Sequence, residues 1–196
     1  MFRLGITGGI GSGKSTAASF FKSKGAFIVD ADDEAKKLII NSDKLQTSII
    51  YEFGENVTHH GRLDLQLLSQ IAFSSPARQQ KLNALVWPSV GDLIKLKEVE
   101  ARKGKITLFI VDAALLLEAG FETFFDSILL ITADSAIRKQ RVALRKNIPE
   151  KQIEQRMALQ MPESEKEKRA DYIIRNNDDR KVLLEKLESY YLTLPL

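Results

Sequence analysis

The chain has 196 residues, of which 44% are hydrophobic and 28% charged, and its formal net charge is +3. This composition is ordinary for a folded protein with one sizeable core, and it excludes an intrinsically disordered chain. The absence of cysteine excludes disulfides, thiolate zinc sites and a cysteine nucleophile. No apolar run approaches the roughly 20 residues that cross a bilayer, and the start of the chain lacks the pattern of a signal peptide. We therefore expect a cytoplasmic protein with no membrane partner.

The excess of basic residues is small, and acidic and basic residues alternate along most of the chain. Such alternation is typical of a solvated surface. A local excess of Lys and Arg would suit a nucleotide as well as it would suit a nucleic acid. We therefore expect no nucleic-acid partner.

The start of the chain has the pattern of a strand, a loop, a helix and a second strand, which opens many α/β folds. Residues 2–6 form a short apolar run before a group of glycines, as in a buried parallel strand. Residues 15–24 carry an apolar face at helical spacing, and Gly25 suits a helix C-terminal cap. Residues 26–29 form a second apolar strand, which ends at the acidic residues 30–33.

Residues 34–103 have helical periodicity and no convincing strand, so we expect a helical insertion beside the sheet. The predicted helices are residues 35–40, 45–53, 64–73 and a long stretch after Pro88, with a turn-rich interruption at residues 58–61.

Strands return after this insertion. The predicted strands are residues 107–111, 127–132 and 172–174, with a short helical segment or loop at residues 115–118. The predicted helices are residues 134–145, 152–160, 163–169 and 181–191, with a break at residues 147–149. Alternation of strands and helices predicts a parallel sheet with helices on both faces.

Residues 8–15 match the phosphate-loop pattern G-x-x-x-x-G-K-[ST] in full, between a predicted strand and a predicted helix. A dinucleotide-binding fingerprint fails, because Lys14 stands where its last glycine belongs. A guanine-reading Asn-Lys-x-Asp segment is also missing, which argues against a GTPase. The ATP-binding residues predicted from this loop are Gly9, Ile10, Gly11, Ser12, Gly13, Lys14, Ser15 and Thr16.

Each residue type in this loop has a chemical reason. Glycines let backbone N–H groups approach the phosphates without a Cβ in the way. Lys14 can reach the β- and γ-phosphates, and the hydroxyl of Ser15 can ligate the Mg²⁺ that bridges them. The loop therefore predicts a P-loop NTPase-type α/β fold with ATP as co-substrate and Mg²⁺ as cofactor.

Carboxylates follow two predicted strands at the edge where open α/β sheets bind ligands. Asp30 and Asp32 come after the second strand and would point the same way if the strand continued. We expect Asp32 to accept a proton from the acceptor hydroxyl, and the alternative is that both aspartates cap the next helix or stay solvated. Asp112 ends a later strand, where it can hold Mg²⁺ through water or, alternatively, cap a helix.

Arg138, Arg141 and Arg145 recur at helical spacing, and Arg156 follows after a break. A guanidinium can clamp phosphoryl oxygens through two hydrogen bonds, and a flap that carries it can close over ATP. We expect one or two of these arginines to touch nucleotide. Most Lys and Glu residues around them are interpreted as a solvated face.

The chain resembles the dephospho-CoA kinase family over nearly its whole length. The stretches that carry the resemblance are residues 7–16, Asp30-Ala31-Asp32, Gly61-Arg62-Leu63-Asp64, Asn83-Ala84-Leu85 before Pro88, Leu115-Leu116-Leu117-Glu118, Arg141 with Arg145, and residues 171–177.

The resemblance implies ATP-dependent phosphorylation of the ribose 3′-hydroxyl of dephospho-CoA, the last step of coenzyme A synthesis. It implies a nucleotide-binding core (1–33 with 104–140 and 170–196), an acceptor domain (34–103) and an arginine-bearing lid (141–169). The catalytic residues it implies are Asp32 as base, Lys14 and Arg141. It also places Arg145 and Asn177 at ATP, and Asp32, Asp64, Leu115 and Glu118 at the acceptor.

Three positions depart from the family pattern. The family usually has histidine at the position of Trp87, arginine at Leu65 and proline at Ala114. Two of these changes remove polar groups from the presumed acceptor side, so acceptor binding is where this chain is expected to differ.

Two alternatives remain open from the residues alone. One is a P-loop kinase for another small hydroxyl acceptor, and the other is a nucleotide-dependent binding module without turnover. We expect a monomer or a weak homo-oligomer with ATP and dephospho-CoA as its partners.

Overall fold

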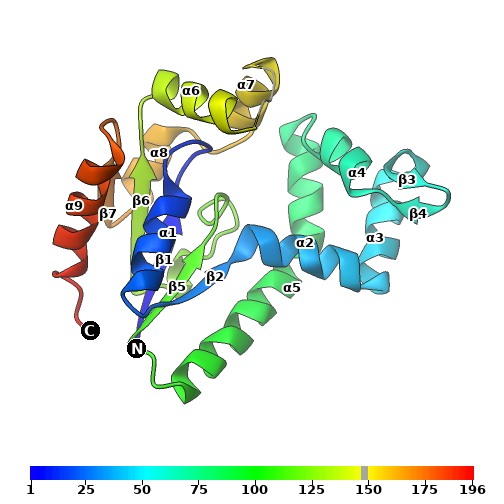
Figure 1. Cartoon of the computed structure of the whole chain (residues 1–196). Coiled ribbons are helices and arrows are strands. Elements are labelled where there is room, and N and C mark those ends of the chain that lie inside the picture. The colour runs from blue at the N-terminus through cyan, green and yellow to red at the C-terminus, as the bar shows by residue number, and fades with distance from the viewer. Residues whose placement is uncertain (147–149) are drawn as a thin grey trace. The chain divides into compact units, whose positions relative to one another are not determined.

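The computed structural model describes residues 1–146 and 150–196, so the predicted break at 147–149 lies outside the described residues. The chain forms two compact units (Figure 1). The first contains residues 1–30 and 96–196, and the second contains residues 31–95. No helix among the described residues has the length and apolar character needed to cross a membrane.

Five strands form the sheet of the first unit in the order β2-β5-β1-β6-β7, and every neighbouring pair is parallel. The strands are β1 (Phe2–Thr7), β2 (Phe27–Asp30), β5 (Leu108–Asp112), β6 (Ser127–Thr132) and β7 (Tyr172–Arg175). Strands of a parallel sheet are covered on both faces and so read as continuous apolar runs, which is why all five were predictable. The predicted α/β fold with a parallel sheet is confirmed.

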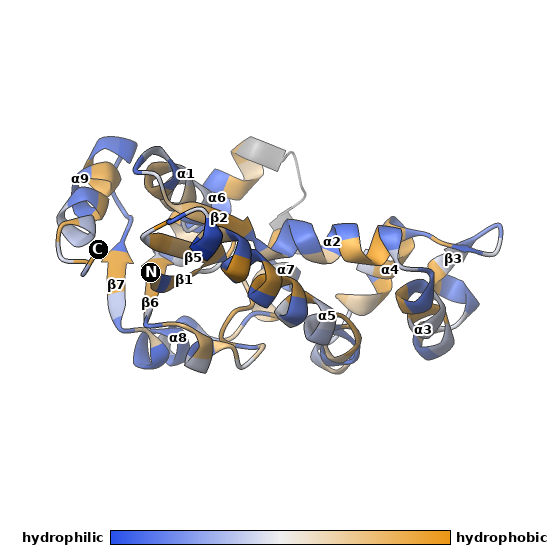
Figure 2. Ribbon diagram, turned by 90° about the horizontal axis from the view of Figure 1, so that it is seen from below, coloured by the Kyte–Doolittle hydropathy of each residue, from blue (hydrophilic) through white to orange (hydrophobic). Residues whose placement is uncertain are grey.

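Helices cover both faces of this sheet. In Figure 2, α1 and α9 lie on one side of the strands and α8 lies on the other. The helices of the unit are α1 (Lys14–Ser23), α6 (Ser135–Lys146), α7 (Glu150–Ala158), α8 (Glu163–Arg169) and α9 (Arg180–Tyr191), with a 3₁₀ turn at Glu122–Phe124 and the end of α5 (Pro76–Lys103). Gly25 follows α1 with a φ of +87°, as expected of a C-terminal cap.

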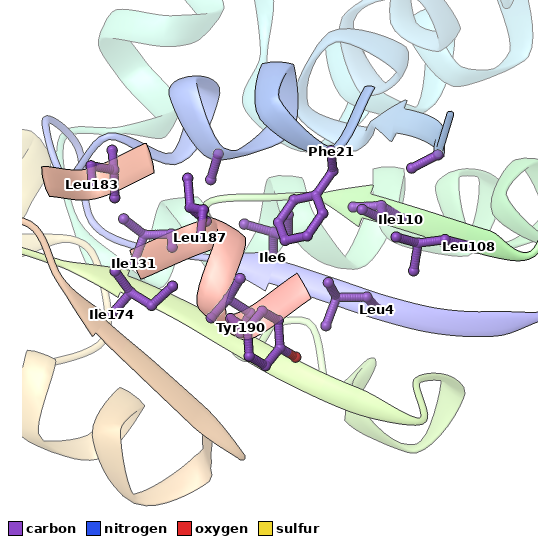
Figure 3. Close-up of a cluster of buried hydrophobic side chains, with 13 residues drawn as sticks. Leu4, Ile6, Phe21, Leu108, Ile110, Ile131, Ile174, Leu183, Leu187 and Tyr190 are labelled. Carbon is purple, nitrogen blue, oxygen red and sulfur yellow. The ribbon is translucent and has the colours of Figure 1, made fainter. Parts of the chain in front are cut away.

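The core of the first unit lies between the sheet and the helices α1 and α9 (Figure 3). Alternate residues of the strands point into it, because side chains of a strand alternate between the two faces. Burial of these side chains fixes the strand register, and with it the positions of the loops at the strand ends. The cluster contains Leu4, Ile6, Ala17, Phe21, Ala26, Leu108, Ile110, Leu129, Ile131, Ile174, Leu183, Leu187 and Tyr190.

The second unit is mainly helical, with one small strand pair. Its elements are α2 (Ala31–Asn41), α3 (Asp43–Phe53), a 3₁₀ turn (Glu55–Val57), β3 (Thr58–His59), β4 (Arg62–Leu63), α4 (Leu65–Ala72) and the first part of α5. The prediction that this region holds no strand is therefore wrong. Residues 58–63 form an antiparallel hairpin too short to produce a readable alternation of apolar and polar residues.

The predicted start of the long helix is also wrong, because α5 begins at Pro76 and contains Pro88 in its interior. An internal proline removes one backbone hydrogen bond, so a helix boundary is the usual expectation. Here Val86, Val90 and Ile94 are buried at a spacing of four residues. Their packing on one face keeps the helix continuous across the proline.

Asp126 ties the start of β6 to the start of β1. Its Oδ2 accepts from the Arg3 backbone N–H at 2.8 Å, and its Oδ1 accepts from Arg3 Nη2 at 2.7 Å. The hydrogen bonds of the Arg3 side chain lower the pKa of the Asp126 carboxyl. A lowered folded-state pKa contributes stability above the unfolded value of about 3.9, and that contribution is lost as the pH falls through the folded value.

We expect Asp126→Asn to lower the free energy of unfolding at pH 7 by roughly 1 kcal/mol or less, since the pair is partly exposed. The difference in Tm from the wild type should shrink as the pH falls below about 4. Thermal unfolding between pH 7 and pH 3 measures both effects, with Asp92→Asn, at an exposed site on α5, as a control. A difference in Tm that stays constant over this range would contradict the assignment.

Candidate active site

The loop between β1 and α1 has the backbone of a phosphate-binding turn. Gly11 and Gly13 have φ angles of +81° and +105°, and Gly13 is the residue before the first turn of α1. The Ser12 N–H donates to the Gly9 carbonyl at 3.1 Å, which closes the turn. No side chain caps the start of α1, so this helix N-terminus can favour an anion.

Neighbouring side chains leave little room for a Cβ at two glycines of this loop. A Cβ on Gly13 would run into the side-chain nitrogen of Asn176, and a Cβ on Gly9 would run into the guanidinium of Arg138. Asn176 is buried and donates from Nδ2 to the Ser12 carbonyl at 2.8 Å. The second half of the loop is therefore held from outside by Asn176.

Lys14 and Asp112 form an ion pair between the loop and the end of β5. Asp112 is 5% exposed and is aligned with Ile6 of β1 and Asp30 of β2 in the sheet register. The carboxyl ends of three strands thus meet beside the phosphate loop, at the edge predicted to hold the ligand. Ser15 is exposed on the first turn of α1.

The prediction that Asp30 and Asp32 point alike along a strand is wrong. β2 ends at Asp30, and α2 begins at Ala31, so Asp32 lies in the first turn of a helix with Asp33 and Glu34. Acidic residues are favourable there because they face the positive end of the helix dipole. Asp32 is half-buried in this turn.

Two residues predicted at ATP hold α6 against the loop that follows β7. Arg141 donates from Nη1 to the Asn176 carbonyl at 2.8 Å and from Nη2 to the Asp178 carbonyl at 2.9 Å. Asn177 accepts from the Asp134 N–H at 2.9 Å. Arg138 lies against the phosphate loop and is 3.5 Å from Glu163.

The side chains of Arg145 and Arg156 lie outside the described residues. The backbone of each belongs to a helix, α6 for Arg145 and α7 for Arg156. Their predicted contacts with nucleotide stay predictions.

The residues predicted at the acceptor lie in different elements. Asp64 caps α4 and accepts from the Gln66 and Leu67 N–H groups at 2.7 and 3.0 Å, which lowers the pKa of its carboxyl. Leu115 is half-buried in the turn after β5. Glu118, in the same turn, accepts from the Met161 N–H at 2.8 Å and is 3.1 Å from Lys166 Nζ.

Three residues that contact the loop or its supports were missed from the sequence. Asn176 neighbours the predicted Asn177, but Asn176 is the one that is buried and donates to the Ser12 carbonyl. Gln160 accepts from the Ile10 N–H at 3.0 Å, although nothing in its local sequence indicates this role. Lys166 was interpreted as part of a solvated face, but its side chain is fully buried.

The described residues contain no cluster of three or more His, Cys, Asp or Glu side chains that could hold a metal ion by themselves. Magnesium in phosphoryl-transfer sites is usually held by one or two protein oxygens, phosphates and water. The hydroxyl of Ser15 and the carboxylate of Asp112 are hard oxygen donors of this kind. The residues present therefore fit a magnesium ion that arrives with a nucleotide.

A family model described as dephospho-CoA kinase matches residues 2–181. This chain belongs to the dephospho-CoA kinase family. The resemblance predicted from the sequence is confirmed, and it extends over both compact units.

Individual kinases of the family are similar to this chain at moderate identity. A dephospho-CoA kinase of Enterococcus faecalis is 37% identical over 178 residues, which cover 90% of this chain and 89% of the relative. The enzyme of Geobacter sulfurreducens is 32% identical over 189 residues, which cover 96% of each chain. A crystal structure from Thermus thermophilus has a TM-score of 0.79 at 31% identity and covers 100% of this chain and 98% of its own.

The three departures from the family pattern have clear places in this kinase. Leu65 is the first residue of α4, where it is exposed, and Trp87 lies within α5. Ala114 follows β5, and its carbonyl accepts from Lys166 Nζ at 3.1 Å. A backbone acceptor does not depend on the side chain, so this contact tolerates alanine where the family usually has proline.

Proposed function

We propose that this chain transfers the γ-phosphoryl group of ATP to the ribose 3′-hydroxyl of dephospho-CoA. The observation that carries this proposal is the phosphate loop, with Lys14 beside Asp112 at the carboxyl edge of the sheet, in a member of the dephospho-CoA kinase family. Such a site binds ATP by its phosphates and leaves the γ-phosphoryl group for transfer.

The ATP side consists of the loop backbone and the residues at its ends. The loop backbone from Gly8 to Gly13, with Thr16, surrounds the phosphates, and Lys14 neutralises the charge on the β- and γ-phosphates. Arg141 and Arg145 belong to the arginine-bearing lid, and Asn177 lies near the adenine. The contacts of Arg141 with the loop after β7 support this proposal, because they connect the lid helix to the presumed adenine side.

Ser15 would ligate Mg²⁺ directly, and Asp112 would hold it through water. When bound, the ion supplies positive charge that neutralises the phosphates during transfer. The remaining work of the site is positioning and electrostatic stabilisation, since a loose transition state requires little covalent help.

Asp32 would orient the 3′-hydroxyl and accept its proton as the oxygen attacks the γ-phosphorus. Its place in the first turn of α2, directly after the carboxyl end of β2 in the chain, supports this role. Asp64, Leu115 and Glu118 are proposed on the acceptor side. We also propose a cytoplasmic enzyme that is a monomer or a weak homo-oligomer and binds neither nucleic acid nor membrane.

Incubation of the purified protein with Mg-ATP and dephospho-CoA tests the function, with mass spectrometry of the acceptor. The expected product is heavier than the acceptor by one phosphoryl group and requires both substrates. A 3′-deoxy analogue of the acceptor is the control and should stay unmodified. If ATP binds but dephospho-CoA stays unmodified, while another small alcohol gains the phosphoryl group, the acceptor assignment is wrong.

A further inference from the structure

Gln160 contacts the phosphate loop, and the phosphoryl-transfer scheme gives this residue no role. Its Oε1 accepts from the Ile10 N–H at 3.0 Å. Ile10 stands between Gly9 and Gly11 in the middle of the loop. Gln160 lies in the segment between α7 and α8. A side-chain carbonyl thus fixes one backbone N–H of the loop that cradles ATP.

The first half of the loop needs such support because Gly8, Gly9 and Gly11 have wide conformational freedom. The second half is already held, since Asn176 donates to the Ser12 carbonyl at 2.8 Å. Gln160 holds the first half in the same way, by accepting from the Ile10 N–H. A loop ordered before ATP arrives binds more tightly, because less conformational entropy is lost on binding.

The segment that carries Gln160 is itself anchored in the protein. The N–H of the next residue, Met161, donates to Glu118 Oε1 at 2.8 Å. The same oxygen is 3.1 Å from Nζ of Lys166, which is fully buried and also donates to the Ala114 carbonyl at 3.1 Å. Separating the partners of a buried ion pair leaves an uncompensated charge, which is strongly unfavourable. The pair therefore favours one geometry of this segment.

We propose that Gln160 is a positioning residue for ATP, which shapes the phosphate loop through Ile10, and that the Lys166–Glu118 pair holds Gln160 in place through Met161. The inference deepens the proposed function and rests on it only where turnover of dephospho-CoA is measured. Binding of nucleotide in the absence of acceptor tests it separately.

Gln160→Met removes the carbonyl acceptor and keeps the length of the side chain. The dissociation constants of ATP and ADP should rise about threefold to tenfold, the effect of one neutral hydrogen bond. Titration calorimetry without acceptor measures them, and the KM for dephospho-CoA and the Tm should stay at wild-type values. Gln140→Met, at an exposed site on α6, is the matched control and should bind nucleotide normally. Wild-type nucleotide affinity in Gln160→Met would overturn the proposal.

Gln160→Glu separates positioning beside the phosphates from a merely structural role. A carboxylate still offers an acceptor to Ile10, but it adds a negative charge near the bound polyphosphate. The variant should bind ATP more weakly than Gln160→Met at low salt. This difference in ATP affinity should shrink as salt is added, because salt screens the repulsion, with a Debye length of about 10 Å at 0.1 M. Equal ATP affinities of the two variants, or a difference in affinity that does not change with salt, would count against the position assigned to Gln160.

The anchor is tested by replacing both charges together with Glu118→Leu and Lys166→Met, because an apolar pair is often tolerated where one buried charge alone is not. This double variant should weaken ATP binding about as much as Gln160→Met. Adding Gln160→Met to it should cause little further loss if the pair acts through Gln160. Losses that multiply would show that the pair acts independently of Gln160. If the wild type phosphorylates no acceptor, the nucleotide affinities still decide this inference.

Discussion

Replacing Lys14 with alanine is expected to weaken ATP binding at least about tenfold and to lower kcat by about two to three orders of magnitude. The ammonium group is the one cationic side chain within the phosphate loop, so its removal takes away the positive charge that the loop itself places at the β- and γ-phosphates. Stabilisation by Lys14 grows as negative charge builds up on the leaving ADP in a loose transition state, which is why the rate should fall more than the affinity. Equilibrium titration with ATP and steady-state kinetics measure the two effects.

Removal of Lys14 also leaves the buried Asp112 without its ion-pair partner. Thermal unfolding of Lys14→Ala and of the Lys14→Ala, Asp112→Asn double variant separates this loss of stability from the loss of catalysis. Lys22→Ala changes an exposed lysine in the last turn of the same helix and should keep wild-type kinetics. Unchanged ATP affinity and rate in Lys14→Ala would disprove the phosphate-loop assignment.

Asp32→Asn is expected to lower kcat by about two to four orders of magnitude, because an amide cannot accept the proton of the attacking hydroxyl. Affinity for ATP should stay close to wild type, since Asp32 is proposed to act on the acceptor. Single-turnover measurement with saturating Mg-ATP and dephospho-CoA reports the chemical step separately from product release.

Asp33→Asn is the matched control for this substitution, because it makes the same change one residue later in the same helical turn. Asp33 is exposed and forms an ion pair with Lys37 at 2.8 Å, a structural contact of the helix surface. It should turn over at the wild-type rate. Near-normal turnover in Asp32→Asn, or an equal loss in both variants, would show that the base lies elsewhere.

Local patterns predicted the sheet and the phosphate loop because each depends on neighbouring residues. The five strands are apolar runs bounded by glycine, charge or turn residues, and α8 begins and ends as its charge pattern indicated. The loop was readable because glycines, a lysine and a serine at fixed spacing have one common use. Segment boundaries were less certain, as Pro88 within α5 shows.

The two-residue spacing of Asp30 and Asp32 did not reveal that Asp32 lies in a helix. Residues i and i+2 lie on the same face of a strand but on different faces of a helix. No proline or glycine marks the end of β2 at Asp30, so the change from strand to helix was not visible in the sequence. The order of the elements was right, yet α2 begins at Ala31, four residues before the predicted helix at 35–40, and this changed the geometry argued for the two aspartates.

The sequence by itself determined the α/β class, the phosphate loop and the resemblance to the dephospho-CoA kinases, because these rest on composition, short-range periodicity and a motif of contiguous residues. Only the tertiary structure decided that Lys166 is buried against Glu118, that Gln160 bonds to Ile10 and that Asn176, beside Asn177, holds the loop. Each of these contacts joins residues far apart in the chain. The environment of a polar side chain is set by the partner that folding brings to it, and local sequence does not encode that partner.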